Sequence, residues 1–475
     1  MTEENKSTQV AVIGAGPGGY PAAFLAADLG LEVTLIDPEE NPGGVCLYRG
    51  CIPSKALLHV AKVITEAEHA SNWGIEYKKP EIDIDKLREW KNGVVQKLVG
   101  GLGQLSKKRK INYVRGRAKF TDSGKLEIKL NDGKTRSLSF EKAVIATGSS
   151  PVKMPGVPDS PNVLDSTSGL DLPEAPDTML IVGGGYIGLE LGTVYAALGT
   201  EVSVVEMTSG LMPGVDRDLV RVLQKRCEKI FSAIMLDTKV TGMDETEKGI
   251  KVEFEGEGLD FKEKVFDKVL VSVGRKPNSE DLGLENTKVN TDSGGFIEVD
   301  AQRRTSDPDI FAIGDVAGEP MLAHKATHEG RVVAEILAGK KAAFEPGAIP
   351  AVVFTDPEIA WCGLTETEAG EKNIKVNVAR FPWGASGRAT TLDRNDGVTK
   401  LVIEPDTDRV LGMGIVGAGA GELISEGVLA VEMAALASDL ELSIHPHPTL
   451  SETVMEAAEA FYGQSTHMYK PGKKK

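Results

Sequence analysis

Residues 9–37, QVAVIGAGPGGYPAAFLAADLGLEVTLID, decide the fold predicted for this chain. The stretch is typical of an apolar strand, a glycine turn, a helix and a second strand that ends in an acid. Gly14, Gly16 and Gly19 form a G-x-G-x-x-G pattern, and Asp37 lies 23 residues after the first glycine. Such glycines let the backbone approach a pyrophosphate at the start of the helix, and the acid accepts a hydrogen bond from an adenosine ribose. The pattern predicts a dinucleotide-binding unit.

The same pattern recurs in residues 178–206, TMLIVGGGYIGLELGTVYAALGTEVSVVE. Gly183, Gly185 and Gly188 are followed by Glu206, again 23 residues after the first glycine. At either site the alternative is a tight strand-to-helix turn without a ligand, but two matches with equal spacing favour two dinucleotides. No arginine follows Glu206 closely to hold a 2′-phosphate, which favours NAD over NADP in the second unit.

Two cysteines, Cys46 and Cys51, lie in GGVCLYRGCIPSK, residues 43–55, soon after the first unit. A C-x4-C spacing occurs in plant-type iron-sulfur sites, but their third cysteine would fall at position 54, which is Ser54. Cys227 and Cys362 are isolated, so a cluster or a zinc site is disfavoured. A disulfide that is repeatedly reduced and reoxidised is the better interpretation, and it suits a flavin bound by the first unit.

The segment between the cysteines must leave helical geometry, because residues five apart on a helix diverge too far for a disulfide. Gly50 can supply that turn. A helix is expected to begin at Cys51, with Pro53 in its first turn, where the missing N–H costs nothing. Cys51 then lies at a helix N-terminus, which favours its thiolate.

The composition of the chain limits the class of protein to which it can belong. The chain has 475 residues, 41% of them hydrophobic, and a net charge of -16. This length predicts two or three domains, and the charge opposes binding to nucleic acid or to an anionic membrane. The first residues, MTEENKSTQ, do not resemble a secretory signal, so we expect a cytoplasmic protein. The terminal KPGKKK is expected to be a solvated tail.

Histidines near the C-terminus are candidate bases. Residues 443–461, SIHPHPTLSETVMEAAEAF, place His445, His447 and Glu452 just before a helical pattern. Dithiol oxidation needs a base to form the thiolate, although a histidine in this position can equally be a surface residue. His324 and His328 fall at i and i+4, but no third ligand is evident, so metal is disfavoured there and no metal is expected elsewhere.

These motifs, together with IFAIGD (310–315), FPWGASGRA (381–389) and HPHPTLSE (445–452), resemble the flavin disulfide reductases over essentially the whole chain. The resemblance is most specific to the branch of that family that oxidises dihydrolipoamide. It implies an α/β fold with two Rossmann-like dinucleotide-binding domains and a C-terminal α+β interface domain. It also implies FAD and NAD as cofactors and a homodimer. The implied partners are the lipoyl domains of the acyltransferases of 2-oxoacid dehydrogenase complexes, and the H protein of glycine cleavage.

Carried over residue by residue, the resemblance gives Cys46 the role of exchanging with substrate and places Cys51 against the flavin. Lys55 and Glu190 are an implied pair near the reactive part of the flavin, and Asp315 is implied to hold its ribityl chain. His447 is the implied base and Glu452 its orienting acid. The other implied cofactor-binding positions are Gly44, Val45, Ala118, Gly148, Gly274, Gly314 and Ala323.

Two departures from the family pattern bear on the site. Asp37 stands where relatives usually have Glu, and either can reach a ribose. Tyr48 and Arg49 lie between the cysteines, and we expect Arg49 to be solvated rather than turned toward a thiolate. The alternatives to dihydrolipoamide oxidation are an NAD(P)H-dependent reductase of another disulfide and a non-catalytic redox-sensing subunit.

The order of the motifs predicts four segments along the chain. Residues 1–150 form the first part of the FAD domain, and residues 151–275 form the NAD domain. Residues 276–346 return to the flavin as a central part, and residues 347–475 form the interface domain.

Overall fold

The computed structural model describes residues 6–469, so the KPGKKK tail lies outside the described residues. Its first sheet follows the order β1-β2-β3-β4-β5-β16, with β1 also paired to β5. The predicted strand, turn, helix and strand of residues 9–37 are β1, α1 and β2, and β1 pairs in parallel with β2. The strands are β1 (Lys6–Ile13), β2 (Val33–Asp37), β3 (Asn112–Asp122), β4 (Lys125–Leu130), β5 (Thr135–Ile145) and β16 (Ile310–Ala312).

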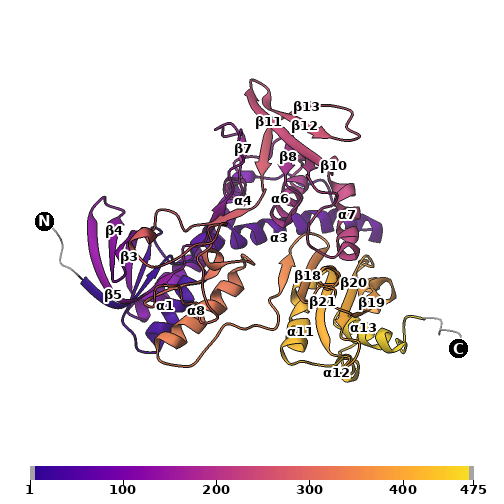
Figure 1. Cartoon of the computed structure of the whole chain (residues 1–475). Coiled ribbons are helices and arrows are strands. Elements are labelled where there is room, and N and C mark those ends of the chain that lie inside the picture. Colours follow the sequence, from indigo (N-terminus) through magenta and orange to yellow (C-terminus); the bar gives the residue numbers. More distant parts are fainter. Residues whose placement is uncertain (1–5, 470–475) are drawn as a thin grey trace.

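Strand β16 brings the chain back to this first sheet after the second unit. Ile310, Phe311 and Ala312 pair in parallel with β5, so the Gly314–Asp315 turn leaves the sheet at the same edge as the first glycine turn. Carboxyl ends of parallel strands meet at one edge of a sheet, where nucleotides bind. Two helices pack beside each other here, α1 (Gly19–Asp28) and α8 (Ala323–Leu337), as Figure 1 shows. The predicted domain boundaries, after residues 150, 275 and 346, remain a prediction.

The second unit has a five-stranded parallel sheet of order β10-β9-β8-β14-β7. Its strands are β7 (Val163–Leu164), β8 (Thr178–Val182), β9 (Glu201–Val205), β10 (Ala233–Met235) and β14 (Lys268–Val271). A separate antiparallel layer, β11 (Thr238–Thr246), β12 (Gly249–Gly256) and β13 (Glu263–Phe266), covers one end, and a two-stranded ribbon joins β6 (Ser149–Pro151) to β15 (Arg275–Pro277). The helices of this unit are α5 (Ser168–Asp171), α6 (Tyr186–Ala197) and α7 (Arg217–Ile230).

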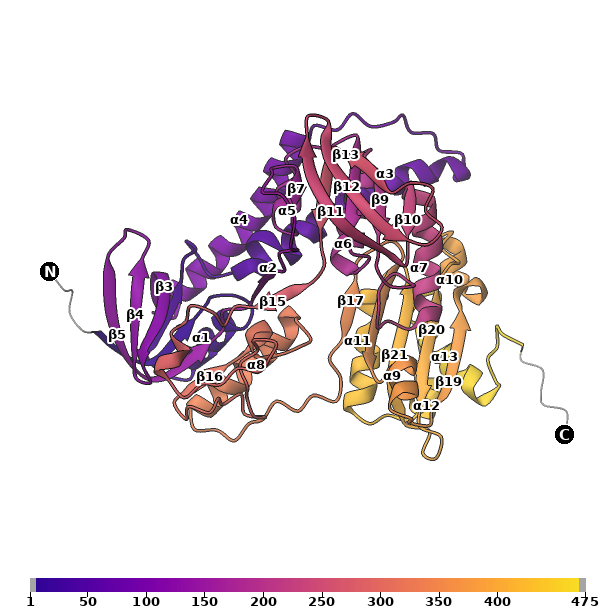
Figure 2. The ribbon, with the colours of Figure 1, turned by 45° about the horizontal axis from the view of Figure 1, so that its top comes forward.

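The C-terminal part is an antiparallel sheet of order β17-β18-β21-β20-β19. The strands are β17 (Ala351–Val353), β18 (Glu358–Gly363), β19 (Asn377–Pro382), β20 (Val398–Ile403) and β21 (Val410–Gly417). The helices are α9 (Glu366–Glu371), α10 (Gly387–Thr391), α11 (Ala420–Glu432), α12 (Ala437–Leu442) and α13 (Glu452–Tyr462). Figures 1 and 2 show this part beside α7, against which β18 and β21 pack, and reached from α8 through a long connection.

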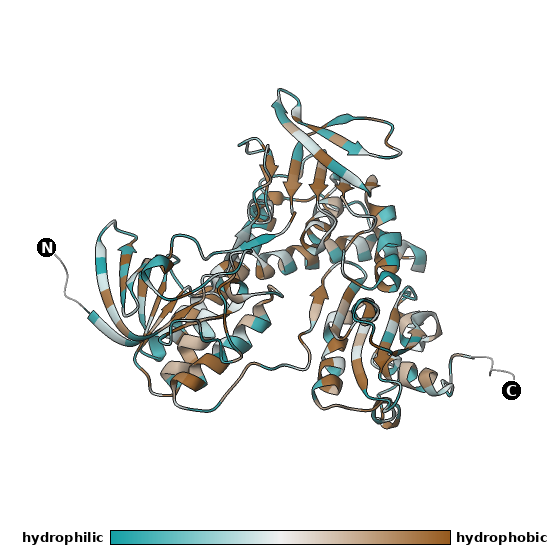
Figure 3. Ribbon diagram, viewed as in Figure 1, coloured by the Kyte–Doolittle hydropathy of each residue, from teal (hydrophilic) through white to brown (hydrophobic). Residues whose placement is uncertain are grey.

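Two long helices connect these parts. Helix α3 (Cys51–His69) runs from the first unit toward the second, and helix α4 (Ile84–Lys108) runs back to the first unit (Figure 1). Leu57, Leu58 and Ala61 of α3 share one buried hydrophobic cluster with α6 and with Val353 of β17. Burial of this apolar surface fixes the direction of α3, and therefore the position of the cysteines at its start. Figure 3 shows the same apolar character along the central strands.

The predicted fold class is confirmed: two Rossmann-like units are followed by a C-terminal α+β part. Within residues 6–469, no helix is both long enough and apolar enough to cross a membrane.

Candidate active site

The two glycine turns have matching geometry. The first glycine of each, Gly14 or Gly183, has a positive φ, 97° or 105°, which L residues rarely adopt. A Cβ on the third glycine would lie 1.8 Å from the carbonyl oxygen of Gly14 in the first turn, and 2.4 Å from that of Gly183 in the second. The middle glycines face open space, because a Cβ on Gly185 would meet no heavy atom within 4 Å and one on Gly16 would meet only Gly44, at 3.9 Å. Each turn therefore offers exposed backbone where a pyrophosphate would bind.

The acids that end the two units, Asp37 and Glu206, are held by the same pattern of backbone hydrogen bonds. Oδ2 of Asp37 accepts a hydrogen bond from Ala15 N over 2.7 Å, and Oε2 of Glu206 accepts one from Gly184 N over 2.7 Å. A second backbone N–H, from Glu39 or Thr208, reaches the other carboxylate oxygen over 2.9 Å. Burial raises the pKa of Asp37, and these backbone hydrogen bonds oppose the shift. Both carboxylates are held in place beside their glycine turns, so the residues present fit two dinucleotides.

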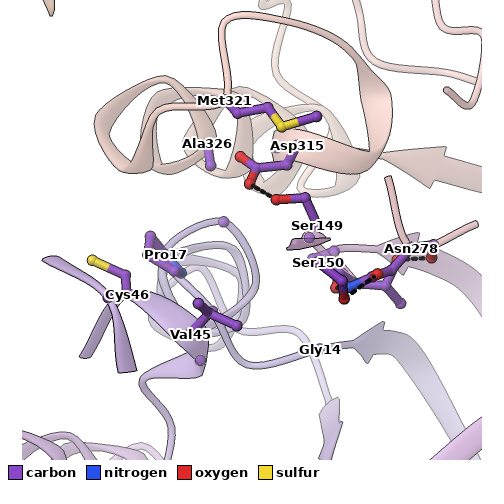
Figure 4. Close-up of a pocket in the computed structure, with 18 of the residues that line it drawn as sticks. Gly14, Pro17, Val45, Cys46, Ser149, Ser150, Asn278, Asp315, Met321 and Ala326 are labelled. Atoms are coloured by element: carbon purple, nitrogen blue, oxygen red, sulfur yellow. Dashed lines mark hydrogen bonds between the residues drawn. The ribbon is translucent and has the colours of Figure 1, made fainter. Parts of the chain in front are cut away.

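A cavity of about 790 Å³ opens from the first glycine turn. It brings together most of the site residues predicted for the first unit and for the cysteine segment: Gly14, Gly16, Asp37, Gly44, Val45, Cys46, Cys51, Lys55, Ala118, Gly148, Glu190, Gly314, Asp315 and Ala323. Figure 4 shows Val45 and Cys46 on one side of the cavity and Asp315, Met321 and Ala326 on the other. Gly19 is buried behind the first turn, and Gly183, Gly185, Gly188, Glu206 and Gly274 do not line this cavity.

Asp315 is fixed by a residue that the sequence analysis missed. Ser149 is buried, and its hydroxyl donates to Oδ2 of Asp315 over 2.5 Å (Figure 4). The same hydroxyl accepts a hydrogen bond from Nε of Arg275 over 2.8 Å. A serine in KAVIATGSSP carries no signal of this role, because its partners lie 126 and 166 residues away in the chain.

The cysteine segment is built as its sequence predicts. Helix α2 (Gly44–Arg49) ends and α3 begins at Cys51, with Gly50 between them at φ −144° and ψ −116°, outside helical geometry. Pro53 lies buried in the first turn of α3. Cys46 and Cys51 are both free thiols, and their side chains hydrogen-bond to each other.

The two thiols differ in acidity. The hydrogen bond with Cys46 lowers the pKa of Cys51 to about 7, with burial opposing the shift and the charge of Lys55 supporting it. The same hydrogen bond, and then burial, raise the pKa of Cys46 far above its usual range. Near neutral pH the reduced pair therefore holds a thiolate at Cys51 and a proton at Cys46.

Lys55 lies one turn after Cys51 and forms an ion pair with Glu190 of α6, Nζ to Oε2, over 2.8 Å. Phe354, which the sequence analysis did not single out, completes this group. Its backbone N donates to Oε1 of Glu190 over 2.9 Å, and Nζ of Lys55 lies 4.5 Å from the centre of its ring. Three segments far apart in the sequence thus position one ammonium group beside the thiolate.

Arg49 is partly exposed, and its guanidinium group pairs with the carboxylate of Glu39 rather than with a thiolate. Glu39 lies two residues after Asp37. The hydroxyl of the neighbouring Tyr48 donates to Asn41 O over 3.0 Å. Both side chains therefore bind α2 to the loop after β2, because the chain reverses there and brings Glu39 within reach.

His447 and Glu452 are brought together at the start of α13. Nδ1 of His447 lies 2.9 Å from Oε1 of Glu452, and Thr449 N donates to Oε2 over 2.8 Å. Burial raises the pKa of Glu452, but the hydrogen bonds from Thr449 and His447 outweigh it, so that the net pKa is lowered. An ionised Glu452 accepts a hydrogen bond from Nδ1–H of His447, which leaves Nε2 unprotonated and free to accept a proton.

His447 is not brought to the cysteines within this chain. It does not line the cavity that contains Cys46, its side chain is 74% exposed, and Figures 1 and 2 place the α12–α13 connection far from α1 and α8. His445, the other candidate base, is held by Glu426, with Nε2 and Oε1 2.8 Å apart, and its side chain is largely buried.

The two other candidate metal positions are already occupied by protein groups. Nε2 of His324 lies 2.7 Å from the carbonyl oxygen of Pro350. In the part of the chain that the structure describes, one group of acids is close enough to hold a metal ion: Asp216, Asp218 and Glu366. The ammonium group of Lys400 lies within hydrogen-bonding distance of all three.

Two dinucleotide sites and a cysteine pair beside the first define a flavoprotein disulfide oxidoreductase. Comparison with models of known protein families supports this class. Residues 8–330 match the pyridine nucleotide-disulphide oxidoreductase model, and residues 349–458 match the dimerisation domain of the same family. The chain belongs to the pyridine nucleotide-disulphide oxidoreductases, and its C-terminal part is a dimerisation domain.

Curated relatives and solved structures narrow the comparison. A dihydrolipoyl dehydrogenase of Vibrio cholerae is 50% identical over 469 residues, covering 98% of this chain and 98% of the relative. One from Thermus scotoductus is 47% identical over 465 residues, covering 98% of this chain and 99% of the relative. The crystal structure of LpdA from Mycobacterium tuberculosis has a TM-score of 0.88 at 25% identity, covering 95% of this chain and 99% of the other. The Escherichia coli flavoprotein disulfide reductase RclA, solved as a Cu(II) complex, has a TM-score of 0.85 at 28% identity and covers 97% of this chain and 99% of its own.

Proposed function

We propose that this protein is an NAD-dependent dihydrolipoamide dehydrogenase. FAD and NAD are its cofactors, held by the first and the second glycine turn respectively. The observation that carries the proposal is the position of Cys51, whose thiol has a pKa of about 7 and lines the cavity that opens from the first glycine turn. The substrate class follows from the curated relatives, which match over nearly the full length of the chain.

The oxidised enzyme carries a Cys46–Cys51 disulfide in this mechanism. Nε2 of His447 takes a proton from one thiol of dihydrolipoamide, and the resulting thiolate attacks Sγ of Cys46. The Cys46–Cys51 bond breaks, a mixed disulfide forms with Cys46, and Cys51 leaves as a thiolate. The second substrate thiol attacks the substrate sulfur of the mixed disulfide, and its proton passes to Sγ of Cys46, so lipoamide is released and Cys46 leaves as a thiol. The substrate dithiol has then lost two electrons and two protons, and the cysteine pair has gained the electrons.

The charged residues of the cavity stabilise the thiolate that forms in this cycle. Lys55 stabilises the Cys51 thiolate, and Glu190 holds the ammonium group of Lys55 in place. FAD bound in the cavity lined by Gly14, Cys51 and Lys55 would supply the redox chemistry that links the cysteine pair to NAD. Ser149 and Asp315 fix the polar wall of the cavity where the ribityl chain would lie.

A shared active site explains why His447 and Cys46 are far apart within one chain. We assign the chain to a homodimer in which Cys46 faces His447 of the partner subunit. The match of residues 349–458 to a dimerisation domain supports this arrangement. The partners that deliver the substrate are lipoyl domains of 2-oxoacid dehydrogenase complexes and the H protein of glycine cleavage, and the cellular site is the cytoplasm.

Steady-state formation of NADH from dihydrolipoamide tests the function. The expected result is turnover with NAD and dihydrolipoamide, and little turnover when NADP replaces NAD or glutathione replaces the dithiol. Turnover of glutathione disulfide with NADPH that is faster than turnover of dihydrolipoamide with NAD would contradict the proposal and support a reductase of another disulfide.

A further inference from the structure

The loop of residues 207–216 follows the acid of the second unit and packs against its glycine turn. Met212 N donates to Gly184 O over 2.9 Å, and a Cβ on Gly184 would lie 2.7 Å from the side chain of Leu211. Gly184 N in turn donates to Glu206. The loop therefore supports both groups expected to hold the adenosine half of NAD, the backbone of the turn and the ribose acid.

Arg217, at the start of α7, makes this loop stiff. Its Nη1 donates to Leu211 O over 2.8 Å and its Nε donates to Val215 O over 2.9 Å, and it also contacts Met212 O. Three carbonyl groups of the loop are thus tied to one guanidinium group. Because of these contacts, a movement at the C-terminal end of the loop also moves Leu211 and Met212.

The loop ends at a cluster of charged residues, in which Lys400 and Asp216 are buried while Asp218, Glu366 and Arg380 are partly exposed. Lys400 lies on β20 with its side chain 1% exposed, and its Nζ is 2.6 Å from Oδ2 of Asp216 and 2.7 Å from Oδ1 of Asp218. Arg380 of β19 adds an ion pair with Asp218 over 2.7 Å. A buried ammonium group surrounded by carboxylates is held strongly, because removing either partner leaves an uncompensated charge.

The carboxylate of Asp216 also contacts the first turn of helix α9 in the dimerisation domain. It accepts hydrogen bonds from Thr367 N over 2.9 Å and from Thr367 Oγ1 over 2.6 Å, and from Glu366 N over 3.2 Å. A carboxylate at this position satisfies N–H groups that the first turn of a helix leaves without partners. The C-terminal end of the loop is therefore anchored in the dimerisation domain, next to the contact of α7 with β18 and β21 (Figure 2).

We propose that Lys400 is a positioning residue for NAD, which acts from the dimerisation domain through Asp216 and the loop of residues 207–216. Lys400 touches neither the glycine turn nor Glu206. Its ammonium group fixes Asp216, the loop stays in place against Gly184, and Glu206 is kept oriented for the ribose. The inference rests on the NAD site of the proposed function, and it assigns part of the affinity of that site to a residue of another domain.

The test is binding of ADP-ribose, the part of NAD without nicotinamide, to the FAD-loaded dimer. Lys400→Met should raise the dissociation constant measured by calorimetry by about fivefold or more, within the range usual for coupling between sites. Hydrogen exchange of the amides in residues 207–216 should become faster in the same variant. The matched control is Lys268→Met. Lys268 is also buried and paired, with Glu174 at 2.9 Å, but it lies on β14 and does not contact the loop.

Unchanged ADP-ribose affinity in a folded Lys400→Met dimer would overturn the proposal, as would an equal loss in Lys268→Met. If Lys400→Met does not fold, Thr367→Val decides the question, because it removes one hydrogen bond to Asp216 and keeps every charge. A rise of about twofold in the dissociation constant is then expected, and no rise would overturn the proposal. No lipoyl substrate is present, so a failure of dihydrolipoamide oxidation does not affect this result.

Discussion

Nζ of Lys55 lies 2.8 Å from Oε2 of Glu190, although 135 residues separate the two in the chain. The pair holds a positive charge beside Cys51, and Phe354 fixes it from a third segment. The reactivity of a cysteine on α3 thus depends on a carboxylate of the second unit.

The pH dependence of cysteine alkylation tests the charge at Cys51. In the reduced protein, Cys51 should react with iodoacetamide at half its maximal rate near pH 7, because only the thiolate reacts. Lys55→Met removes a stabilising cation, so the pKa of Cys51 should rise and the midpoint should move to higher pH. Mass spectrometry of the alkylated peptides gives the rates. Burial raises the pKa of both Cys227 and Cys362 to about 12, so they serve as unreactive references. An unmoved midpoint in Lys55→Met would show that Lys55 does not act on the thiolate.

Replacement of the proposed base should remove most of the activity. His447→Gln should lower kcat for dihydrolipoamide oxidation by about a hundredfold or more, as expected for loss of a general base. Glu452→Gln should cost less, about tenfold, because the imidazole remains but loses its fixed orientation. The matched control is His467→Gln, since His467 is another exposed histidine of this part that pairs with a glutamate, Glu456. Equal losses in the control and in His447→Gln would argue against a specific role.

Complementation between inactive chains tests the shared active site. Cys46→Ser and His447→Gln homodimers should each be nearly inactive. After an equal mixture is unfolded and reassociated, about half of the dimers should contain one chain of each kind. In those dimers one site carries both defects and the other carries none, so activity should return to roughly a quarter of the wild-type level. No recovery, with FAD retained and mixed dimers found by native mass spectrometry, would mean that both residues act from one chain.

Coenzyme preference should follow Glu206. The double variant Glu206→Gln with Met207→Arg removes the carboxylate charge and adds a cation for a 2′-phosphate at a position that is 71% exposed. The ratio of kcat/KM for NADP to that for NAD should rise by about tenfold or more, which corresponds to about 1.4 kcal/mol. Met207→Arg alone is the control and should shift the ratio less. If the double variant keeps the wild-type ratio, another residue contacts the ribose.

Local sequence was sufficient to predict the two units of strand, glycine turn, helix and strand. The glycines of the two turns and the acids Asp37 and Glu206 lie within one strand, turn, helix and strand, so their geometry depends on neighbours close in the chain. The boundary between α2 and α3 at Gly50 was predictable for the same reason, because helix geometry and the chemistry of cysteine pairs constrain a few consecutive residues. Family resemblance added the pairing of Lys55 with Glu190.

Only the tertiary structure revealed the contacts that tune these elements. Ser149 orients Asp315, Phe354 holds Glu190, and Arg49 pairs with Glu39. Lys400 reaches Asp216 and Asp218 across two domains, with 182 residues between Lys400 and Asp218. No periodicity or motif marks such residues, since a buried polar group is selected by the partner that packing brings to it rather than by its neighbours in the chain. The sequence by itself therefore determined the fold class and predicted the residues that we propose bind nucleotides and exchange electrons. Packing of distant segments decided which charges surround those residues, because ion pairs and buried hydrogen bonds act over a few ångströms in space.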